Sequence, residues 1–275
     1  MGKIIAFANQ KGGVGKTTSC VNVSASLAAM GKKVLLVDID PQGNASSGLG
    51  VKKTASMKSV YNLIVGDASI EEVVQPTPIE NFDVIPANID LAGVEVEMVY
   101  MDSREQIIKK LLEKAKDSYD FITIDCPPSL GLLTINALTG SDSVLIPIQC
   151  EFFALEGLSQ LMNTIRLIKK KLNPNIKIEG VLLTMRDSRS SLGTQVADEI
   201  KKHFTTSVYE TTIPRNIRLA EAPSHGLPIF LYDKNCVGCK AYLSLAEEIL
   251  TKNGMEYNRI VTDTKRRKKW VHKTA

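Results

Sequence analysis

The sequence predicts an α/β fold in which a doubly wound, mostly parallel sheet is flanked by helices. Short apolar runs alternate along the chain with longer amphipathic stretches. Most of the short runs are continuously apolar, which is typical of strands whose two faces are both covered by helices. Strands that alternate with helices in this way favour an open, doubly wound sheet.

The elements of this fold follow from the positions of the apolar residues. The strands are expected at Ile4–Asn9, Val34–Asp38, Phe82–Ile85, Phe121–Asp125, Ser143–Ile148, Gly180–Thr184 and Val208–Ile213. The helices are expected at Thr17–Met30, Glu105–Lys116, Glu156–Leu172, Leu192–Phe204 and Ala241–Thr251, with a short one near Val60–Val65. Their apolar residues recur at helical spacing and should face the sheet. The polar segment Gly43–Pro78 is expected to be irregular and to cover a site.

Length and composition are those of an ordinary globular protein, with 275 residues, 44% of them hydrophobic and 23% charged. One α/β domain accommodates such a length. We therefore expect residues 1–253 to form a single domain and residues 254–275 to form a basic C-terminal tail. The run Lys265–Lys269 in this tail is compatible with a solvated chain end and with a surface for polyanions. The net charge of +4 does not by itself indicate nucleic-acid binding.

The chain has no apolar run of 18 residues, so no membrane span is expected. No secretory signal precedes the first apolar run. The five cysteines are odd in number and scattered, which argues against a secreted disulfide framework. We expect a cytoplasmic protein.

A glycine-rich loop between the first strand and the first helix is the strongest single motif. It reads Asn9-Gln10-Lys11-Gly12-Gly13-Val14-Gly15-Lys16-Thr17-Thr18. Glycines let backbone N–H groups point at phosphate oxygens, and the following helix adds the positive end of its dipole. Lys16 is expected to reach the β- and γ-phosphates, and Thr17 to offer its hydroxyl to Mg²⁺. The sequence therefore predicts a P-loop, although Gln10 holds the place of the usual first glycine.

Two strands end in acidic residues that should meet at this loop. Parallel strands deliver their carboxyl ends to one edge of the sheet, where ligands bind. Asp125 ends an apolar run and has the position of a Walker B aspartate, which helps to hold Mg²⁺. Asp38 ends the second strand and is expected to support the metal shell, and Asp40 follows it.

The loop motif Lys11–Thr17 resembles the deviant Walker A motif of the ParA/MinD group. Further stretches resemble the ParA/Soj family of partition ATPases specifically: Asp40–Ser46, Asp125–Gly131, Thr184–Arg189 and Ile213–Gly226. The resemblance spans about Lys3–Leu250, with these motifs in the family's order.

The resemblance implies roles for individual residues. Lys11 would cross a dimer interface to the phosphates bound by the other subunit, so that two chains enclose ATP between them. Asp40 would orient or deprotonate the water that attacks the γ-phosphate, and Pro214 and Arg215 would lie against the adenine base. Arg189 and Arg218 would contact DNA without sequence preference, as guanidinium groups suit phosphate contacts.

The resemblance also implies a function and partners. An ATP-bound homodimer would coat double-stranded nucleoid DNA, and a ParB/Spo0J-like centromere-binding protein would stimulate hydrolysis and release. No stable membrane association is expected.

Two alternatives remain open from the sequence. A MinD-like membrane positioner needs an amphipathic C-terminal helix, and Lys265–Ala275 offers only Trp270 and Val271 as large apolar residues. An iron–sulfur or metal role would use the lone pair Cys236 and Cys239, which are otherwise free thiols.

Overall fold

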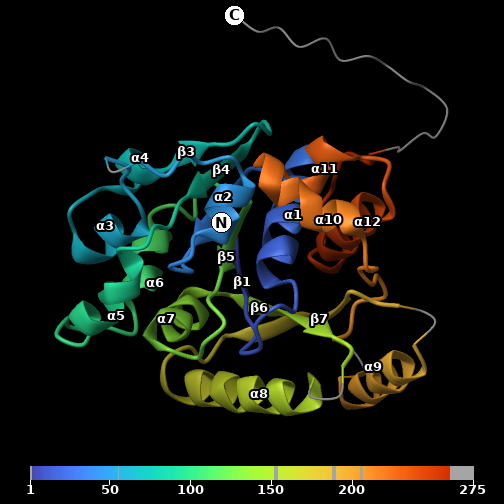
Figure 1. The fold of residues 1–275 in the computed structure, drawn as a ribbon. Coiled ribbons are helices and arrows are strands. Elements are labelled where there is room, and N and C mark those ends of the chain that lie inside the picture. The colour runs from blue at the N-terminus through green and yellow to red at the C-terminus, as the bar shows by residue number, and fades with distance from the viewer. Residues whose placement is uncertain (1, 55, 152–153, 188–189, 205–206, 261–275) are drawn as a thin grey trace, which may run out of the picture.

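A central sheet organises the molecule (Figure 1). The structure is a computed structural model and describes residues 2–54, 56–151, 154–187, 190–204 and 207–260. The strands are β1 (Lys3–Phe7), β2 (Val34–Asp38), β3 (Gln75–Pro76), β4 (Phe82–Ile85), β5 (Phe121–Asp125), β6 (Ser143–Gln149) and β7 (Lys177–Thr184). They form a seven-stranded sheet in the order β3-β4-β2-β5-β1-β6-β7, in which only the β3–β4 pair is antiparallel. The predicted fold class is confirmed.

Helices cover both faces of this sheet, as the continuous apolar strands require. One face carries α1 (Lys16–Ala29), α2 (Asn44–Gly48), α10 (Ile217–Glu221), the 3₁₀ turn η1 (Ala222–His225), α11 (Ile229–Tyr232) and α12 (Val237–Lys252). The other face carries α3 (Val60–Val65), α4 (Ile70–Val73), α5 (Leu91–Met98), α6 (Ile107–Glu113), α7 (Leu132–Gly140), α8 (Ala154–Lys171) and α9 (Ser191–His203).

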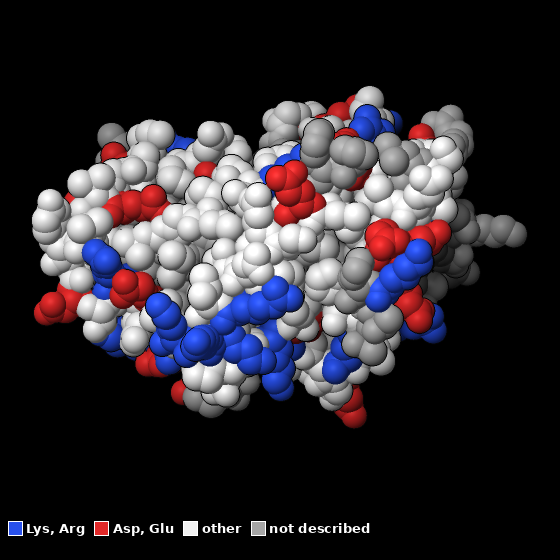
Figure 2. All heavy atoms as spheres, turned by 90° about the horizontal axis from the view of Figure 1, so that it is seen from below, with Lys and Arg blue, Asp and Glu red and all other residues white. Residues whose placement is uncertain are grey.

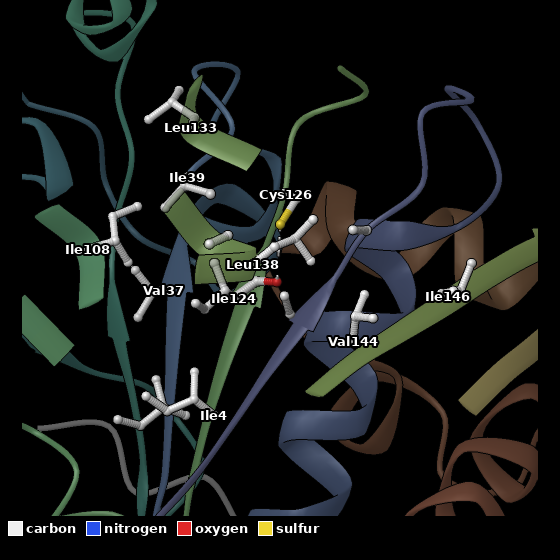
Figure 3. Packing of buried hydrophobic residues seen from close by; sticks show 14 of the residues in the cluster. Ile4, Val37, Ile39, Ile108, Ile124, Cys126, Leu133, Leu138, Val144 and Ile146 are labelled. Carbon is white, nitrogen blue, oxygen red and sulfur yellow. Dashed lines mark hydrogen bonds between the residues drawn. The ribbon is translucent and has the colours of Figure 1, made fainter. Parts of the chain in front are cut away.

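Each central strand divides its side chains between two cores, because successive residues of a strand point to opposite faces. In β1, Ile4 and Ala6 join the core under α3–α9, whereas Ile5 and Phe7 join the core under α1 and α12. Figure 3 shows part of the first core, where Val37 lies among side chains from the sheet and the covering helices.

The parallel register brings functional segments to one edge of the sheet. Phe7, the last residue of β1, is paired with Asp125 at the end of β5. Asp38, the last residue of β2, is paired with the same Asp125. The glycine loop follows β1 directly, so the loop and both aspartates lie at the same edge.

The predicted strand at Val208–Ile213 is wrong. The segment runs beside β7 but makes only isolated bridges, Val181 with Val208 and Arg186 with Pro214. Between them, the N–H groups of Glu210 and Thr211 donate to the carboxylate of Glu248 on α12, at 3.0 and 3.1 Å. The carboxylate of Glu248 thus accepts from backbone N–H groups that, in a strand, would donate to the neighbouring strand.

Other elements differ from the prediction in extent. Gly43–Pro78 is less irregular than expected, since it contains α2, α3, α4 and all of β3. Helices α5 and α7 were not predicted. The division at residue 253 stays a prediction; α12 ends at Lys252, and residues 261–275 of the basic tail lie outside the described residues.

Close packing of β7 against the segment after α9 gives a testable stability effect. A β-carbon at Gly180 would lie 2.2 Å from Cε2 of the buried Tyr209 ring. Gly180→Ala is therefore expected to lower the free energy of unfolding by about 1–3 kcal/mol, measured by urea denaturation. The control is Gly157→Ala in α8, where the added carbon meets open space and helix propensity should raise stability by about 0.5–1 kcal/mol. Equal stability of the two variants would contradict this packing.

Candidate functional site

The glycine loop connects β1 to α1 in a conformation that only glycine adopts readily. Gly13 and Gly15 have φ angles of 72° and 83°, in the left-handed region. Gly15 is the N-cap of α1, and no side chain caps this helix end. The first N–H groups of α1 therefore remain available to an anion, and the helix dipole favours one there. The loop has the geometry of a phosphate site, as predicted.

Lys16 lies over its own loop. Its side chain is buried, with 7% of the residue exposed, and its Nζ donates to the carbonyl oxygen of Lys11 at 3.0 Å. Burial lowers the pKa of Lys16, and the nearby carboxylate of Asp125 opposes this shift. A phosphate at this loop would supply the negative charge that a buried ammonium group lacks.

Asp125 is the most exceptional group of the site. It is fully buried, and neither of its carboxylate oxygens has a hydrogen-bond partner among the described residues. Burial raises the pKa of Asp125 well above its usual range, and the neighbouring Asp38 raises it further. The Thr17 hydroxyl opposes the rise without making a hydrogen bond of normal geometry. An unsatisfied buried carboxylate beside a hydroxyl fits Mg²⁺, which takes one or two protein oxygens and completes its shell with phosphates and water.

Asp38 has a different environment although it is adjacent. One oxygen accepts from the N–H of Ser46 at 2.8 Å and from its hydroxyl at 2.7 Å. The other accepts from the N–H of Asp40 at 3.2 Å. Burial raises the pKa of Asp38 to about 6. Because both oxygens are occupied, this geometry does not favour the metal contact predicted for Asp38, which stays a prediction. Ser46, which the sequence analysis missed, fixes this carboxylate.

Asp40 lies two residues beyond the strand, at the same edge. It is buried, and its Oδ1 accepts from the N–H of Gln42 at 3.0 Å. Its other oxygen is free to meet a ligand, since no described residue donates to it. The structure therefore brings Asp40, Asp125 and Lys16 together, as the sequence analysis expected.

The side chain of Lys11 points away from the glycine loop, unlike that of Lys16. Its Nζ pairs with Oε2 of Glu151 at 3.0 Å, and 35% of its side chain is exposed. Its N–H donates to Oδ1 of Asn9, and the Nδ2 group of Asn9 donates to the carbonyl of Pro147. The backbone of Lys11 is thus fixed while its side chain reaches outward. Glu151 was not predicted, because its proximity depends on the turn after β6.

An open pocket of about 450 Å³ adjoins the loop. Its lining includes Pro214 and Arg215, which the sequence analysis placed at a nucleotide base, together with Gly15 and Thr18 of the phosphate loop. The hydroxyl of Thr184 donates to the carbonyl of Val14 at 2.8 Å and ties β7 to the loop. The wall also contains Ile213 and Asn216, which border Pro214 and Arg215, and residues that were not predicted: Met185, Ile217, Leu219, Ala220 and Tyr242.

The two arginines expected at DNA have different outcomes. Arg189 lies outside the described residues. Arg218 is at the surface, where its Nη1 pairs with Glu221 at 2.8 Å and its Nε with Asp233 at 3.7 Å. The structure thus gives Arg218 two acidic neighbours.

The cysteine pair is part of a helix cap. The Sγ of Cys236 accepts from the N–H of Cys239 at the start of α12, and Cys239 is buried. Across the described residues, no group of three or more His, Cys, Asp or Glu side chains is arranged to hold a metal ion. Helices long and apolar enough to cross a membrane are likewise absent from the described part of the chain.

Comparison with known proteins identifies the family. The family model described as an AAA domain matches residues 2–178. The sporulation initiation inhibitor protein Soj of Bacillus subtilis (strain 168) is 62% identical over 249 residues, which cover 90% of this chain and 98% of Soj. The chain belongs to the ParA/Soj family. The chromosome-partitioning ATPase Soj of Treponema pallidum (strain Nichols) is 51% identical over 254 residues, covering 92% of this chain and 99% of that protein.

A solved structure of a nucleotide-binding protein has the same fold. Cobyrinic acid a,c-diamide synthase from Mycobacterium smegmatis, with a bound ATP analog and magnesium, is 34% identical. It has a TM-score of 0.80, and the alignment covers 95% of this chain and 100% of that one. The strand order and the glycine loop described above are thus those of a nucleotide-binding fold.

The contrast between the two paired aspartates can be measured without nucleotide. Asp125→Asn should raise the free energy of unfolding at pH 7.5 by about 1–3 kcal/mol, because it removes a carboxyl that is ionised in the unfolded chain at this pH but is buried without a hydrogen-bond partner in the folded one. Asp38→Asn should lower it, because Asp38 accepts three hydrogen bonds. Chemical denaturation of both variants tests this difference.

The same experiment has a pH signature. A carboxyl whose pKa is raised in the folded state holds its proton there to higher pH, so stability falls as pH rises above the unfolded value of about 4. For Asp38 this loss extends through its folded pKa of about 6. Asp125→Asn should flatten the decline, and an unchanged pH profile would contradict the raised pKa of Asp125.

Proposed function

We propose that this chain is a partition ATPase that segregates a chromosome or plasmid as an ATP-dependent dimer. The Treponema relative described above is a chromosome-partitioning ATPase. The geometry that supports such an activity here is a phosphate loop beside a buried, unsatisfied carboxylate, Asp125.

One observation supports the proposed dimer: the side chains of Lys11 and Lys16 point in different directions. Lys16 is buried over its own loop, whereas Lys11 extends outward to Glu151. A cation that leaves its own phosphate site is free to serve the phosphates of a second subunit. Lys16 of one subunit and Lys11 of the other, converging on one triphosphate, would offset its charge, and a diphosphate would lack the terminal charge that holds the subunits together.

We assign the nucleotide contacts to residues along one edge of the sheet. The loop residues Lys11–Thr18 would surround the phosphates, and Pro214 and Arg215 would line the base pocket. Thr17 and Asp125 would hold Mg²⁺. When bound, Mg²⁺ would neutralise charge that develops during phosphoryl transfer.

The residues of this chain would then position the reactants for hydrolysis. Asp40 would accept a hydrogen bond or proton from a water placed in line with the γ-phosphate. The water oxygen forms the new bond to phosphorus while the bond to the β–γ bridging oxygen breaks, which yields ADP and phosphate. Positioning and electrostatics contribute most of the catalysis in such a reaction.

The dimer would couple this reaction to DNA. In the ATP-bound state it would bind nucleoid DNA through Arg189 and Arg218, and a ParB/Spo0J-like protein would trigger hydrolysis and release. Of the alternatives, the cysteine pair has a structural use as the cap of α12. No observation favours a membrane positioner.

The dimer is tested by removing its two key groups. Asp40→Ala should lower ATP turnover by at least about 100-fold, because it removes the group that positions water. With saturating Mg-ATP it should run as a dimer in size-exclusion chromatography with light scattering, and with ADP as a monomer. Asp40→Ala/Lys11→Ala should stay monomeric with either nucleotide while still binding a fluorescent ATP analogue.

The control for this experiment is Asp40→Ala/Lys52→Ala, which removes an exposed lysine outside the loop. It should dimerise like Asp40→Ala. If Asp40→Ala itself remained monomeric in saturating Mg-ATP, the proposed dimer would be refuted.

DNA binding is tested by co-sedimentation with a mixed-sequence duplex in ATP, in ADP and without nucleotide. Binding should require ATP and should weaken steeply with salt, because phosphate contacts release counterions. Arg189→Ala and Arg218→Ala should each weaken it. DNA binding that is equally strong with and without ATP would instead indicate that the basic tail, 254–275, makes the contact.

A further inference from the structure

The second half of α8 presents a row of cations to solvent. Arg166, Lys169 and Lys170 are exposed and lie three and four residues apart, which places them on the same side of the helix. Lys171 follows and is also exposed. The opposite side of α8 is buried in the core through residues such as Ile165. The cations therefore point away from the sheet.

Lysines of α6 extend this surface. The carboxyl end of α7 lies between the two helices: a β-carbon at Gly140 would lie 3.1 Å from the Cα of Lys109. On the other side, Asn173, just after α8, donates to the carbonyls of Leu138 and Ser141 at 3.1 and 2.8 Å. Lys109 and the exposed Lys110 thus flank the same end of α7 as the α8 cations.

We name this surface the α8 basic patch, and its members are Lys109, Lys110, Arg166, Lys169, Lys170 and Lys171. Figure 2 views the molecule from the side of α8 and shows Lys and Arg side chains gathered in one area of this face. Like charges this close repel each other. A concentration of them needs a compensating charge from the chain or from a ligand.

The described residues supply none. No member of the α8 basic patch forms an ion pair within the described chain. Arg166 donates only to the amide oxygen of Asn163, at 2.8 Å. Glu113, the exposed acid of α6, makes no ion pair with the patch either. The helix dipole favours lysines in the last turn of α8, but it does not explain Arg166 or the lysines of α6.

The chemistry of the patch suits a duplex better than a membrane. Duplex DNA offers a negative charge for about every 1.7 Å of its length, and lysines neutralise it without reading sequence. A helix that binds a bilayer needs an exposed apolar face. On α8 the apolar face is buried, and Leu167 is its one exposed large apolar side chain.

We propose that the α8 basic patch binds the phosphate backbone of double-stranded DNA. The inference rests on the proposed function in taking DNA as the polyanion, and it adds a second contact surface to the arginines proposed above. Arg218 lies on α10, which covers the opposite face of the sheet and where Glu221 and Asp233 already neutralise it. The patch has no such internal neutralisation, so DNA phosphates would be its counter-charge.

The test is a salt titration of the full-length protein with Mg-ATP and a fluorescent mixed-sequence duplex. Lys169→Gln/Lys170→Gln should raise Kd about tenfold at ~0.1 M KCl. The slope of log K against log salt should become shallower by about 2, since each lost phosphate contact contributes about 0.9. The matched control, Lys33→Gln/Lys52→Gln, removes two exposed lysines elsewhere and should stay within about twofold of the wild type. DNA-free ATPase rates and melting temperatures should be unchanged in both.

The outcomes separate this inference from the proposed function. Failure of the wild type to bind DNA in Mg-ATP would overturn both. DNA binding by Lys169→Gln/Lys170→Gln that matches the control, with Arg218→Ala defective, would overturn the patch alone. Phosphatidylglycerol vesicles form a second arm: a variant that loses vesicle binding but keeps DNA binding would identify a membrane surface and overturn the proposal.

Discussion

The parallel alignment of β1, β2 and β5 is the constraint on which the site depends. It pairs Asp125 with Phe7 on one side and with Asp38 on the other. The carboxylate is thereby buried next to the phosphate loop, without a hydrogen-bond partner of its own. An ionised carboxylate in that state is costly for the protein, and a ligand that brings positive charge relieves this cost.

The two aspartates illustrate how neighbouring positions of one sheet take different tasks. Asp38 is satisfied by Ser46 and by the backbone of Asp40, so it stabilises the start of α2. Asp125 has no such partners and stays available. The lysines divide in the same way, since Lys16 is held over the loop and Lys11 is turned outward. Asp38 and Lys16 are thus held by hydrogen bonds within the chain, whereas Asp125 has no partner and Lys11 extends to the surface.

Much of the fold could be predicted because burial on both faces leaves a local record in the sequence. Continuous apolar runs located β2, β4 and β5 at their observed bounds. The glycine loop indicated the phosphate site, because its positive φ angles require glycine at positions 13 and 15. The segment 208–213 was mistaken for a strand because its local pattern is that of one. What prevents it is Glu248, whose carboxylate takes two of its donors from a distant helix. Thr184 and Glu151 escaped prediction for the same reason, because their contacts join elements far apart in the chain. Ser46 lies only eight residues from Asp38, but its contact depends on how the chain turns after β2.

The hydrogen bonds that Asp38 accepts from Ser46 and from the backbone of Asp40 restrict the position of Asp40. The Ser46 hydroxyl donates to Asp38 and also accepts from the N–H of Ala87, at 3.0 Å, in the loop after β4. The stretch from Asp38 to Ser46 is thus anchored at both ends to the interior. Asp40 therefore sits on a stiff span, whereas the side chain of Lys11 extends from its fixed backbone to a surface ion pair with Glu151. When a nucleotide binds, we therefore expect the side chain of Lys11 to change position while the carboxylate of Asp40 keeps its orientation.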